Sequence, residues 1–333
     1  MNRAENLIES IAAMENLCIA WRKTIRGKRD KGSVQQYRRH LDENLCILSS
    51  DLLHGTVKWG PYNKFTIHDP KERVIKVAPL ADRIAYHAIC NICEPIFDRF
   101  QIYDSYACRR GKGQFAALER AQKFSKYHSH YLKLDVRKYF DSIPHEILFS
   151  RLERLFSDPV LLKLFESLLS SYSASPGRGI PIGSLTSQFF ANHYLAHFDH
   201  FVKEELRVRG YIRYMDDMLF FGHSSDEMKR IRDKVREFFC TRLHLDLKPP
   251  QLNRTQSGIP FLGLRVYCGT LRLSHRARYR FRRKVRKNIA FYADGNLTEE
   301  KFHVKMETLF AFLQRTSSLE FRRRVLRENG FGS

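Results

Sequence analysis

The sequence predicts an α+β fold, and three patterns in it carry that prediction. Apolar and polar side chains alternate over residues 131–137, as they do in a half-buried strand. Aromatic and β-branched residues at 211–214 and 218–222 flank a Met-Asp-Asp run, which predicts two strands joined by a tight turn. Residues 224–238 open with capping-box spacing and then repeat apolar side chains at helical period. The order strand, helices, hairpin, helix, strand predicts a ferredoxin-like α+β unit.

The other elements follow from the same signals. Residues 4–22 gather apolar side chains on one face of a helix. Residues 60–79 predict a β-hairpin with His-Asp-Pro-Lys at 68–71 as its turn. Further helices are expected over 80–100, 113–127, 145–172 and 184–207, and the chain after Leu273 is expected to be basic and helical.

The composition predicts a polyanionic partner. Lys and Arg outnumber Asp and Glu by 58 to 36, which gives a formal net charge of +22 and a pI near 9.8. A charge of this size is typical of proteins that bind nucleic acid. A membrane surface is the competing partner for a basic chain. However, the sequence has no run of 18 apolar residues, and its start lacks an apolar signal core, so we expect no membrane partner and a cytoplasmic protein.

The seven cysteines are expected to be reduced thiols, because their number is odd and the chain is long. Cys90 and Cys93 form a Cys-x-x-Cys, with His87 three residues before it. A zinc site would need a fourth ligand at matching spacing, and the sequence offers none. We therefore expect these side chains to pack in the core of a helix.

The strongest candidate site is the pair Asp216–Asp217 at the hairpin turn. Adjacent carboxylates repel each other, and burying them costs free energy unless a cation takes up their charge. A hard divalent cation with oxygen ligands does so. Asp135, on the polar face of 131–137, would join the pair if the two strands are neighbours. Two Mg²⁺ ions about 3.5–4 Å apart could then activate an attacking hydroxyl and stabilise a leaving pyrophosphate, which is nucleotidyl transfer without a covalent nucleophile. The alternative is an exposed hairpin and a solvated Asp135 without function.

These segments resemble motifs A and C of reverse transcriptases. Three further motifs of that family follow in the family's order: the fingers motif at 73–84, the next motif at 105–113 and the primer-grip motif at 258–263. The resemblance implies a right-hand polymerase with fingers, a ferredoxin-like palm with an antiparallel sheet, and a short helical thumb. It implies three parts: an N-terminal segment with fingers at 1–127, a palm at 128–272 with a finger-helix insertion at about 145–180, and a thumb at 273–333.

The run Gly-Ile-Pro-Ile-Gly-Ser-Leu-Thr-Ser-Gln at 179–188 narrows the resemblance. Most reverse transcriptases have Gln-Gly and Ser-Pro where this chain has Ile182–Gly183 and Ser187–Gln188. The substitution resembles reverse transcriptases of diversity-generating retroelements, which make adenine-mutagenised cDNA from a template-repeat RNA to diversify a variable gene (mutagenic retrohoming). Gly183 would let the backbone approach the nascent base pair, and Ile182 would remove a polar contact that helps to hold it. Alternatively, Ile182 is a core residue.

The resemblance also assigns roles to single residues. Lys64, Lys71 and Arg73 in the fingers would bind the triphosphate of a dNTP, for which arginine offers bidentate contacts. Phe140 would be the steric gate that excludes a 2′ hydroxyl, or alternatively a core residue. Gln188 would contact the base pair or sugar, or cap a helix.

Two further residues are assigned near the metals. Val136 would offer its backbone carbonyl to a metal. Lys248 is a candidate general acid for pyrophosphate, although it lies about three positions early in the family's pattern, where Gln251 takes the expected place. Arg254 or water could serve instead.

The basic run of the tail would be a thumb that grips nucleic-acid phosphates. Its residues are Arg280, Arg282, Arg283, Lys284, Arg286 and Lys287. A solvated basic helix is the alternative interpretation. From the short tail we expect no RNase H, endonuclease, integrase or maturase-type DNA-binding domain after it, which would argue against an autonomous retrotransposon or a group II intron protein.

The resemblance implies a set of partners. They are template RNA, the cDNA/RNA duplex, dNTPs, two Mg²⁺ ions with Mn²⁺ as a substitute, and an accessory variability determinant protein that forms a homopentameric helical-bundle ring. The source would be a bacterium or phage. Two alternatives stay open: another prokaryotic reverse transcriptase, of retron, CRISPR-associated or abortive-infection type, and a non-catalytic RNA-binding scaffold.

Overall fold

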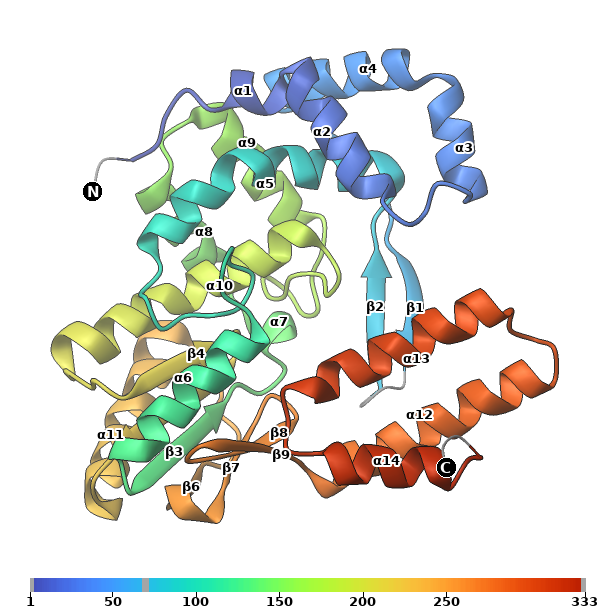
Figure 1. Cartoon of the computed structure of the whole chain (residues 1–333). Helices are drawn as coiled ribbons and strands as arrows, with labels where there is room; N and C mark the ends of the chain where they lie inside the picture. Colours follow the sequence, from blue (N-terminus) through green and yellow to red (C-terminus); the bar gives the residue numbers. More distant parts are fainter. Residues whose placement is uncertain (1–2, 68–71, 331–333) are drawn as a thin grey trace. The chain divides into compact units, whose positions relative to one another are not determined.

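The computed structural model describes residues 3–67 and 72–330 (Figure 1). The chain forms two compact units and passes between them several times. Unit 1 comprises the chain up to Gly111 together with 135–207 and 233–249, and unit 2 comprises 112–134, 208–232 and the chain from Pro250 onward. These units cut across the three parts expected from the sequence, and those boundaries stay a prediction.

Unit 1 is mainly helical, and its centre is the 21-residue helix α5 (Leu80–Phe100). α2 (Met14–Ile25) and α10 (Leu185–His200) both pack against α5. The other helices of this unit are α1 (Ile8–Ala12), α3 (Gly32–Arg39), α4 (Leu41–His54), α7 (Tyr139–Ser142), α8 (His145–Leu155), α9 (Pro159–Ser170) and the π-helical turns η1 (Phe201–Glu205) and η2 (Phe239–Leu243).

Two of the expected helices are in fact broken. The helix expected over 4–22 divides into α1 and α2, because Ala13 takes an extended conformation with ψ 135°. The helix expected over 145–172 divides into α8 and α9. Asp158 caps α9 by accepting from the backbone N–H groups of Val160 and Leu161, and Pro159 suits the first helical position.

The hairpin expected over 60–79 is confirmed as β1 (Asn63–Ile67) paired with β2 (Arg73–Val77), and its place in the fingers stays a prediction. The strands are antiparallel, and Lys64 lies opposite Lys76. The expected turn at 68–71 lies outside the described residues.

Unit 2 carries a four-stranded sheet in the order β4-β5-β3-β6. β3 (His130–Asp135) pairs antiparallel with β6 (Gln251–Arg254), and β4 (Tyr211–Tyr214) with β5 (Asp217–Gly222). This order matches the ferredoxin-like arrangement expected from the sequence. α6 (Gln114–Tyr127) packs against β4 and β5, and Leu132 and Leu134 are fully buried, as the alternation over 131–137 predicted. α11 (Ser225–Phe238) and β3 each cross from one unit to the other.

The C-terminal part of unit 2 is a second sheet followed by three helices (Figure 1). Strands β7 (Ile259–Phe261), β8 (Leu264–Tyr267) and β9 (Thr270–Leu273) form an antiparallel sheet in that order, preceded by the 3₁₀ turn η3 (Thr255–Ser257). The helices are α12 (His275–Ala293), α13 (Glu299–Gln314) and α14 (Leu319–Arg327). Phe281 and Val285 are buried four residues apart on α12, so they form the packing face of the basic helix.

Candidate active site

The β4–β5 hairpin places the Asp pair at its turn, as predicted. Tyr214 pairs with Asp217, so that Met215 and Asp216 form a two-residue connection. Met215 takes a left-handed φ of +54°, which costs free energy in a residue other than glycine. The fully buried Arg213 offsets part of this cost by donating from Nη1 to the Met215 carbonyl at 3.1 Å. The sequence showed only that a charged residue lies inside an apolar strand.

Asp217 is held within unit 2 by Lys133 of β3. The Nζ atom of Lys133 lies 3.0 Å from Asp217 Oδ2 and 3.0 Å from the carbonyl of Pro260 on β7. Both side chains are mostly buried, with 15% of Lys133 and 20% of Asp217 exposed. An ammonium group between two oxygen acceptors is a charge-assisted arrangement. Lys133 therefore fixes the first residue of β5 and ties it to the segment that resembles the primer grip.

Asp135 is held within unit 1 by Lys248. The Nζ atom of Lys248 lies 2.6 Å from Asp135 Oδ1, and its backbone N–H donates to the Asp135 carbonyl at 2.8 Å. Arg137 in turn donates to the Asp246 carbonyl at 2.8 Å. Val136 is fully buried between these two bonds, and its own carbonyl is the acceptor in neither. This backbone pairing fixes Lys248 beside Asp135, whatever its spacing in the family's pattern.

The donor chemistry suits the divalent ions that the sequence implies. Asp135 ends β3, Asp217 begins β5, and β3 and β5 are neighbours in the sheet. Carboxylate oxygens are the ligands that Mg²⁺ prefers, and two of the three carboxylates already contact a lysine ammonium. Within residues 3–67 and 72–330, however, no three His, Cys, Asp or Glu side chains are grouped so that they could hold a metal. The three-carboxylate site therefore stays a prediction.

The 179–188 segment packs against the fingers hairpin. The Lys76 backbone N–H of β2 donates to the Ile182 carbonyl at 3.0 Å, and Ile180 donates to the Phe140 carbonyl at 2.8 Å. Gly183 has φ +110°, and a Cβ there would lie 3.0 Å from the Lys76 carbonyl oxygen. Glycine is thus required here by the close approach of β2, a reason that the sequence did not indicate.

Ile180 and Ile182 differ in burial. Ile180 is 1% exposed and belongs to the core, whereas Ile182 is half-buried. Phe140 is also half-buried, on the short helix α7, where its ring meets that of Tyr139 edge-on at 5.8 Å. The burial of Ile182 and Phe140 leaves part of each side chain accessible to a ligand.

The dNTP residues expected in the fingers are placed only in part. Lys64 lies on β1 and is exposed. Arg73 begins β2, but its side chain, like the whole of Lys71, lies outside what the structure describes. Gln188 lies on α10, where its Oε1 accepts from the Cys108 thiol at 3.3 Å. The sequence analysis missed Lys76, whose Nζ lies 3.6 Å above the Tyr172 ring. Its burial lowers the pKa of Lys76.

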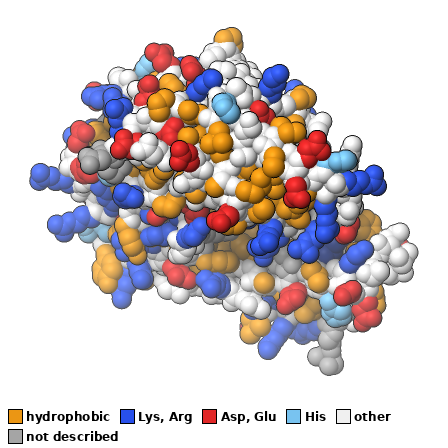
Figure 2. All heavy atoms as spheres, turned by 90° about the horizontal axis from the view of Figure 1, so that it is seen from above, with side chains coloured by type: hydrophobic (Ala, Val, Ile, Leu, Met, Phe, Trp, Pro, Cys, Tyr) orange, Lys and Arg blue, Asp and Glu red, His pale blue; other side chains and the backbone are white. Residues whose placement is uncertain are grey.

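The thumb residues all lie on α12. Arg283, Lys284, Arg286 and Lys287 are exposed, whereas Arg280 and Arg282 are half-buried. Arg282 donates to Glu328 at 3.4 Å, so it is tied to the α14 end rather than free for phosphate. Figure 2 shows Lys and Arg side chains spread over one face of the molecule.

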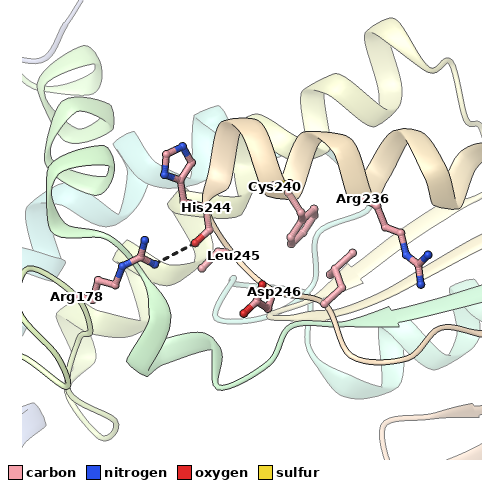
Figure 3. Close-up of a pocket in the computed structure, with 8 residues that line it drawn as sticks. Arg178, Arg236, Cys240, His244, Leu245 and Asp246 are labelled. Carbon is pink, nitrogen blue, oxygen red and sulfur yellow. Dashed lines mark hydrogen bonds between the residues drawn. The ribbon is translucent and has the colours of Figure 1, made fainter.

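A cavity lies beside the segment that carries Lys248 (Figure 3). Arg178 donates to the His244 carbonyl at 3.1 Å, and Asp246 and Leu247 line the same cavity. This bond helps to fix the turn at His244, which has φ +52°. Arg178 therefore helps to hold the start of the segment in which Lys248 contacts Asp135.

The family can now be assigned. A model of the reverse transcriptase (RNA-dependent DNA polymerase) family matches residues 65–266, more than half of the chain. The chain belongs to the reverse transcriptase family. This confirms the resemblance stated from the motifs, and with it the mixed helix and strand fold of a right-hand polymerase. Each of the three carboxylates lies inside the matched region.

Several curated proteins are similar to this chain. The putative COX1/OXI3 intron 1 protein of Saccharomyces cerevisiae is 25% identical over 170 residues, 48% of this chain and 20% of that protein. The intron 2 protein of the same yeast is 24% identical over 214 residues, 60% of this chain and 25% of its own length. The chain thus spans only a small part of these intron proteins. Protein YkfC of Escherichia coli strain K12 is 23% identical over 317 residues, 79% of this chain and 83% of that protein.

Two solved structures are similar to this chain. Telomerase from Candida albicans, in complex with a fragment of telomeric RNA, has a TM-score of 0.49 at 13% identity, over 89% of this chain and 58% of that one. A Cas6-RT-Cas1–Cas2 complex has a TM-score of 0.44 at 22% identity, over 72% of this chain and 27% of that one. Separately, none of the helices within the described residues is both long and apolar enough to span a bilayer.

Proposed function

We propose that this chain is an RNA-templated DNA polymerase in which Asp135, Asp216 and Asp217 bind two divalent cations. When bound, the cations would supply activation of the primer 3′ hydroxyl and charge stabilisation of the leaving pyrophosphate. The chain's own contribution is positioning: β3 and β5 present carboxylates, and Lys133 and Lys248 hold two of them in fixed rotamers.

The observation that carries the proposal is the pair of lysine–carboxylate contacts. Lys133 lies on β3 in unit 2 and Lys248 lies in the segment before β6 in unit 1, yet each contacts one carboxylate that the sequence assigned to metal binding.

For the narrower class, we propose a reverse transcriptase of a diversity-generating retroelement. The support is the Ile-Gly pair at 182–183 and the half-buried state of Ile182, which leaves it accessible where the sequence places the nascent base pair. Its apolar side chain offers no hydrogen bond there. Adenine in the template forms only two base-pair hydrogen bonds, so it would depend most on the protein to hold the pair.

The proposal includes the partners and conditions that the resemblance implied. These are template-repeat RNA, dNTPs, Mg²⁺ with Mn²⁺ as a substitute, a homopentameric accessory protein, and action in the cytoplasm of a bacterium. We expect full-length cDNA synthesis on the structured template RNA to require the accessory protein. Full-length, self-primed cDNA from the purified chain alone would contradict that requirement.

Sequencing of cDNA made on a defined RNA tests both levels of the proposal. The wild-type chain should make cDNA whose errors gather opposite template adenines, and Asp135→Asn should make none. Ile182→Gln should reduce the adenine bias, because it restores a hydrogen-bonding side chain, and about 1.4 kcal/mol already changes a ratio tenfold. An error spectrum spread evenly over all four bases would favour a retron, CRISPR-associated or abortive-infection enzyme. Absence of any cDNA would favour the RNA-binding scaffold.

A further inference from the structure

We propose that a cavity in unit 1, apart from the carboxylates, binds a phosphate group of single-stranded RNA. This inference rests on the RNA-templated function proposed above. The cavity has a volume of about 230 Å³, well above the ~10–15 Å³ that a single water needs. Its basic lining comprises Lys23, Arg26, Lys28, Arg83 and His87. Among the described residues, no Asp or Glu lines it.

The cavity also lies at the start of two helices. α5 begins at Leu80, so Arg83 lies in its first turn, and the start of α10 contributes Gly183, Ser184 and Leu185 to the lining. The first turn of a helix carries unsatisfied N–H groups and a partial positive charge. The backbone therefore adds to the positive potential of the side chains, and neither source is compensated by a carboxylate in the lining.

The helix dipoles explain the positions of only some of these basic residues. Lys23 and Arg26 lie at the C-terminal end of α2, where the helix dipole favours cations. Arg83 lies at the opposite kind of helix end, where a cation is disfavoured. Its Nε is buried and has no hydrogen-bond partner among the described residues. The preceding Asp82 does not line the cavity, and its Oδ2 accepts from the Gly60 N–H at 2.9 Å.

The titration of the lining residues supports a shared positive potential. Burial lowers the pKa of His87, and the positive charges of Lys23, Lys28 and Arg83 lower it further. Burial, together with the charges of Arg83 and Lys31, likewise lowers the pKa of Lys28. A bound anion would relieve this repulsion, and a phosphate would also accept hydrogen bonds from a guanidinium group.

RNA is the phosphate source that the location favours. Gly183 lines the cavity, and Ile182 beside it is the residue proposed to touch the nascent base pair. Because Gly183 and Arg83 line the same cavity, we expect a template strand held at Ile182 to bring a neighbouring phosphate to it. The basic residues Lys23, Arg26 and Lys28 lie outside the 65–266 region that defines the family match, so the family assignment does not by itself indicate this site.

Binding of single-stranded RNA to Arg83→Gln tests the proposal. The full chain is titrated in EDTA at several salt concentrations, so that no synthesis occurs. Loss of one phosphate contact should weaken binding and reduce the slope of log K against log salt by about 0.7. The matched control is Arg39→Gln, an exposed arginine on α3 outside the cavity, which should keep the parental slope. An equal loss in both variants would show a general charge effect and overturn the site.

Two further measurements keep the outcome decisive. Arg83→Gln should unfold at the parental temperature or above, because it removes a buried nitrogen without a partner; if it unfolds early, the exposed Lys28→Gln replaces it in the binding assay. Inorganic phosphate and dNTP are titrated in parallel by thermal shift. If phosphate or dNTP stabilises the parent but not Arg83→Gln, and the two bind RNA with equal affinity, the ligand of the cavity would be a free nucleotide or phosphate and not RNA. Because binding is measured in EDTA without synthesis, a failed polymerase assay would not be mistaken for a failed site.

Discussion

The Nζ atom of Lys248 lies 2.6 Å from Oδ1 of Asp135. The pair is fixed by the backbone, because Lys248 and Asp135 are joined in addition by a main-chain hydrogen bond of 2.8 Å. Lys248 was expected to donate a proton to pyrophosphate, yet it contacts a proposed metal ligand. In the proposed function, Lys248 would hold this carboxylate until a metal binds.

Lys248→Gln should therefore lower the Mg²⁺ concentration needed for half-maximal primer extension. A lysine that competes for Asp135 weakens metal binding, and exposed ion pairs of this kind are worth up to about 1 kcal/mol, or about fivefold. Lys248→Arg should keep the parental midpoint. Should Lys248→Gln instead slow nucleotide addition at saturating Mg²⁺ with no change in midpoint, the general-acid role would be favoured.

Lys133→Met should destabilise the fold. The substitution leaves the Asp217 carboxylate and the Pro260 carbonyl without this donor in a mostly buried place. A lost charged hydrogen bond of this kind costs about 1–3 kcal/mol. Urea unfolding monitored by circular dichroism gives the free energy of unfolding. Lys123→Met, on the solvent side of α6, is the control and should change it little. A urea unfolding midpoint equal to that of the parent would mean that the Lys133 contacts do not stabilise the fold.

Gly183→Ala should also lower stability. A Cβ would lie 3.0 Å from the Lys76 carbonyl oxygen, and the φ of +110° is strained for any residue with a side chain. The expected cost is about 1–3 kcal/mol. Gly111→Ala provides the comparison, because it shares a positive φ but meets no atom within 4 Å. A smaller loss at Gly183 than at Gly111 would argue against the close approach of β2.

The buried His193 and the half-buried His197 predict acid sensitivity. Burial lowers the pKa of His193 to about 4 and that of His197 to about 3, and the neighbouring Arg151 lowers that of His197 further. Both are therefore neutral in the folded state but take up protons when unfolded below pH 6.5. Their contribution to stability is present above pH 6.5 and is lost as the pH falls toward 4. Each can contribute about 1.4 kcal/mol per pH unit in that window.

His197→Phe should make this loss shallower. Its ring packs 4.8 Å from that of Phe100, and its Nε2 has no hydrogen-bond partner among the described residues, so phenylalanine suits the place. Thermal unfolding between pH 7 and pH 5 measures the effect. A pH profile parallel to that of the parent would show that His197 does not titrate on unfolding.

Local sequence patterns predicted the strands and helices, whereas helix breaks and side-chain contacts depended on residues far apart in the chain. The alternation over 131–137 and the Asp pair predicted β3 and the β4–β5 hairpin, because both depend on neighbouring residues. The break between α8 and α9 involves Asp158, whose second carboxylate oxygen accepts from Leu7 and Ile8, about 150 positions away. The Lys133 contact to Pro260 spans 127 positions. No period or motif in the sequence reports such contacts.

The glycine at 183 shows a similar limit. The motif predicted a close approach of the backbone to the nascent base pair, which stays a prediction; the close approach of the β2 backbone at Gly183 was not predicted. The anion cavity has no motif, since its basic residues come from α2, the following loop and α5. Charge clusters of this kind form only when distant helices pack together.

Single-nucleotide addition by Asp216→Asn on an RNA template tests the central claim most directly. The wild-type chain and the variant are compared with dNTP and Mg²⁺, and RNA affinity is measured on the same preparations. The variant should lose nucleotide addition while its RNA affinity stays near the parental value, because the change removes a metal ligand and no basic surface. Primer extension by Asp216→Asn at the parental rate would contradict the assignment of Asp216 to nucleotidyl transfer.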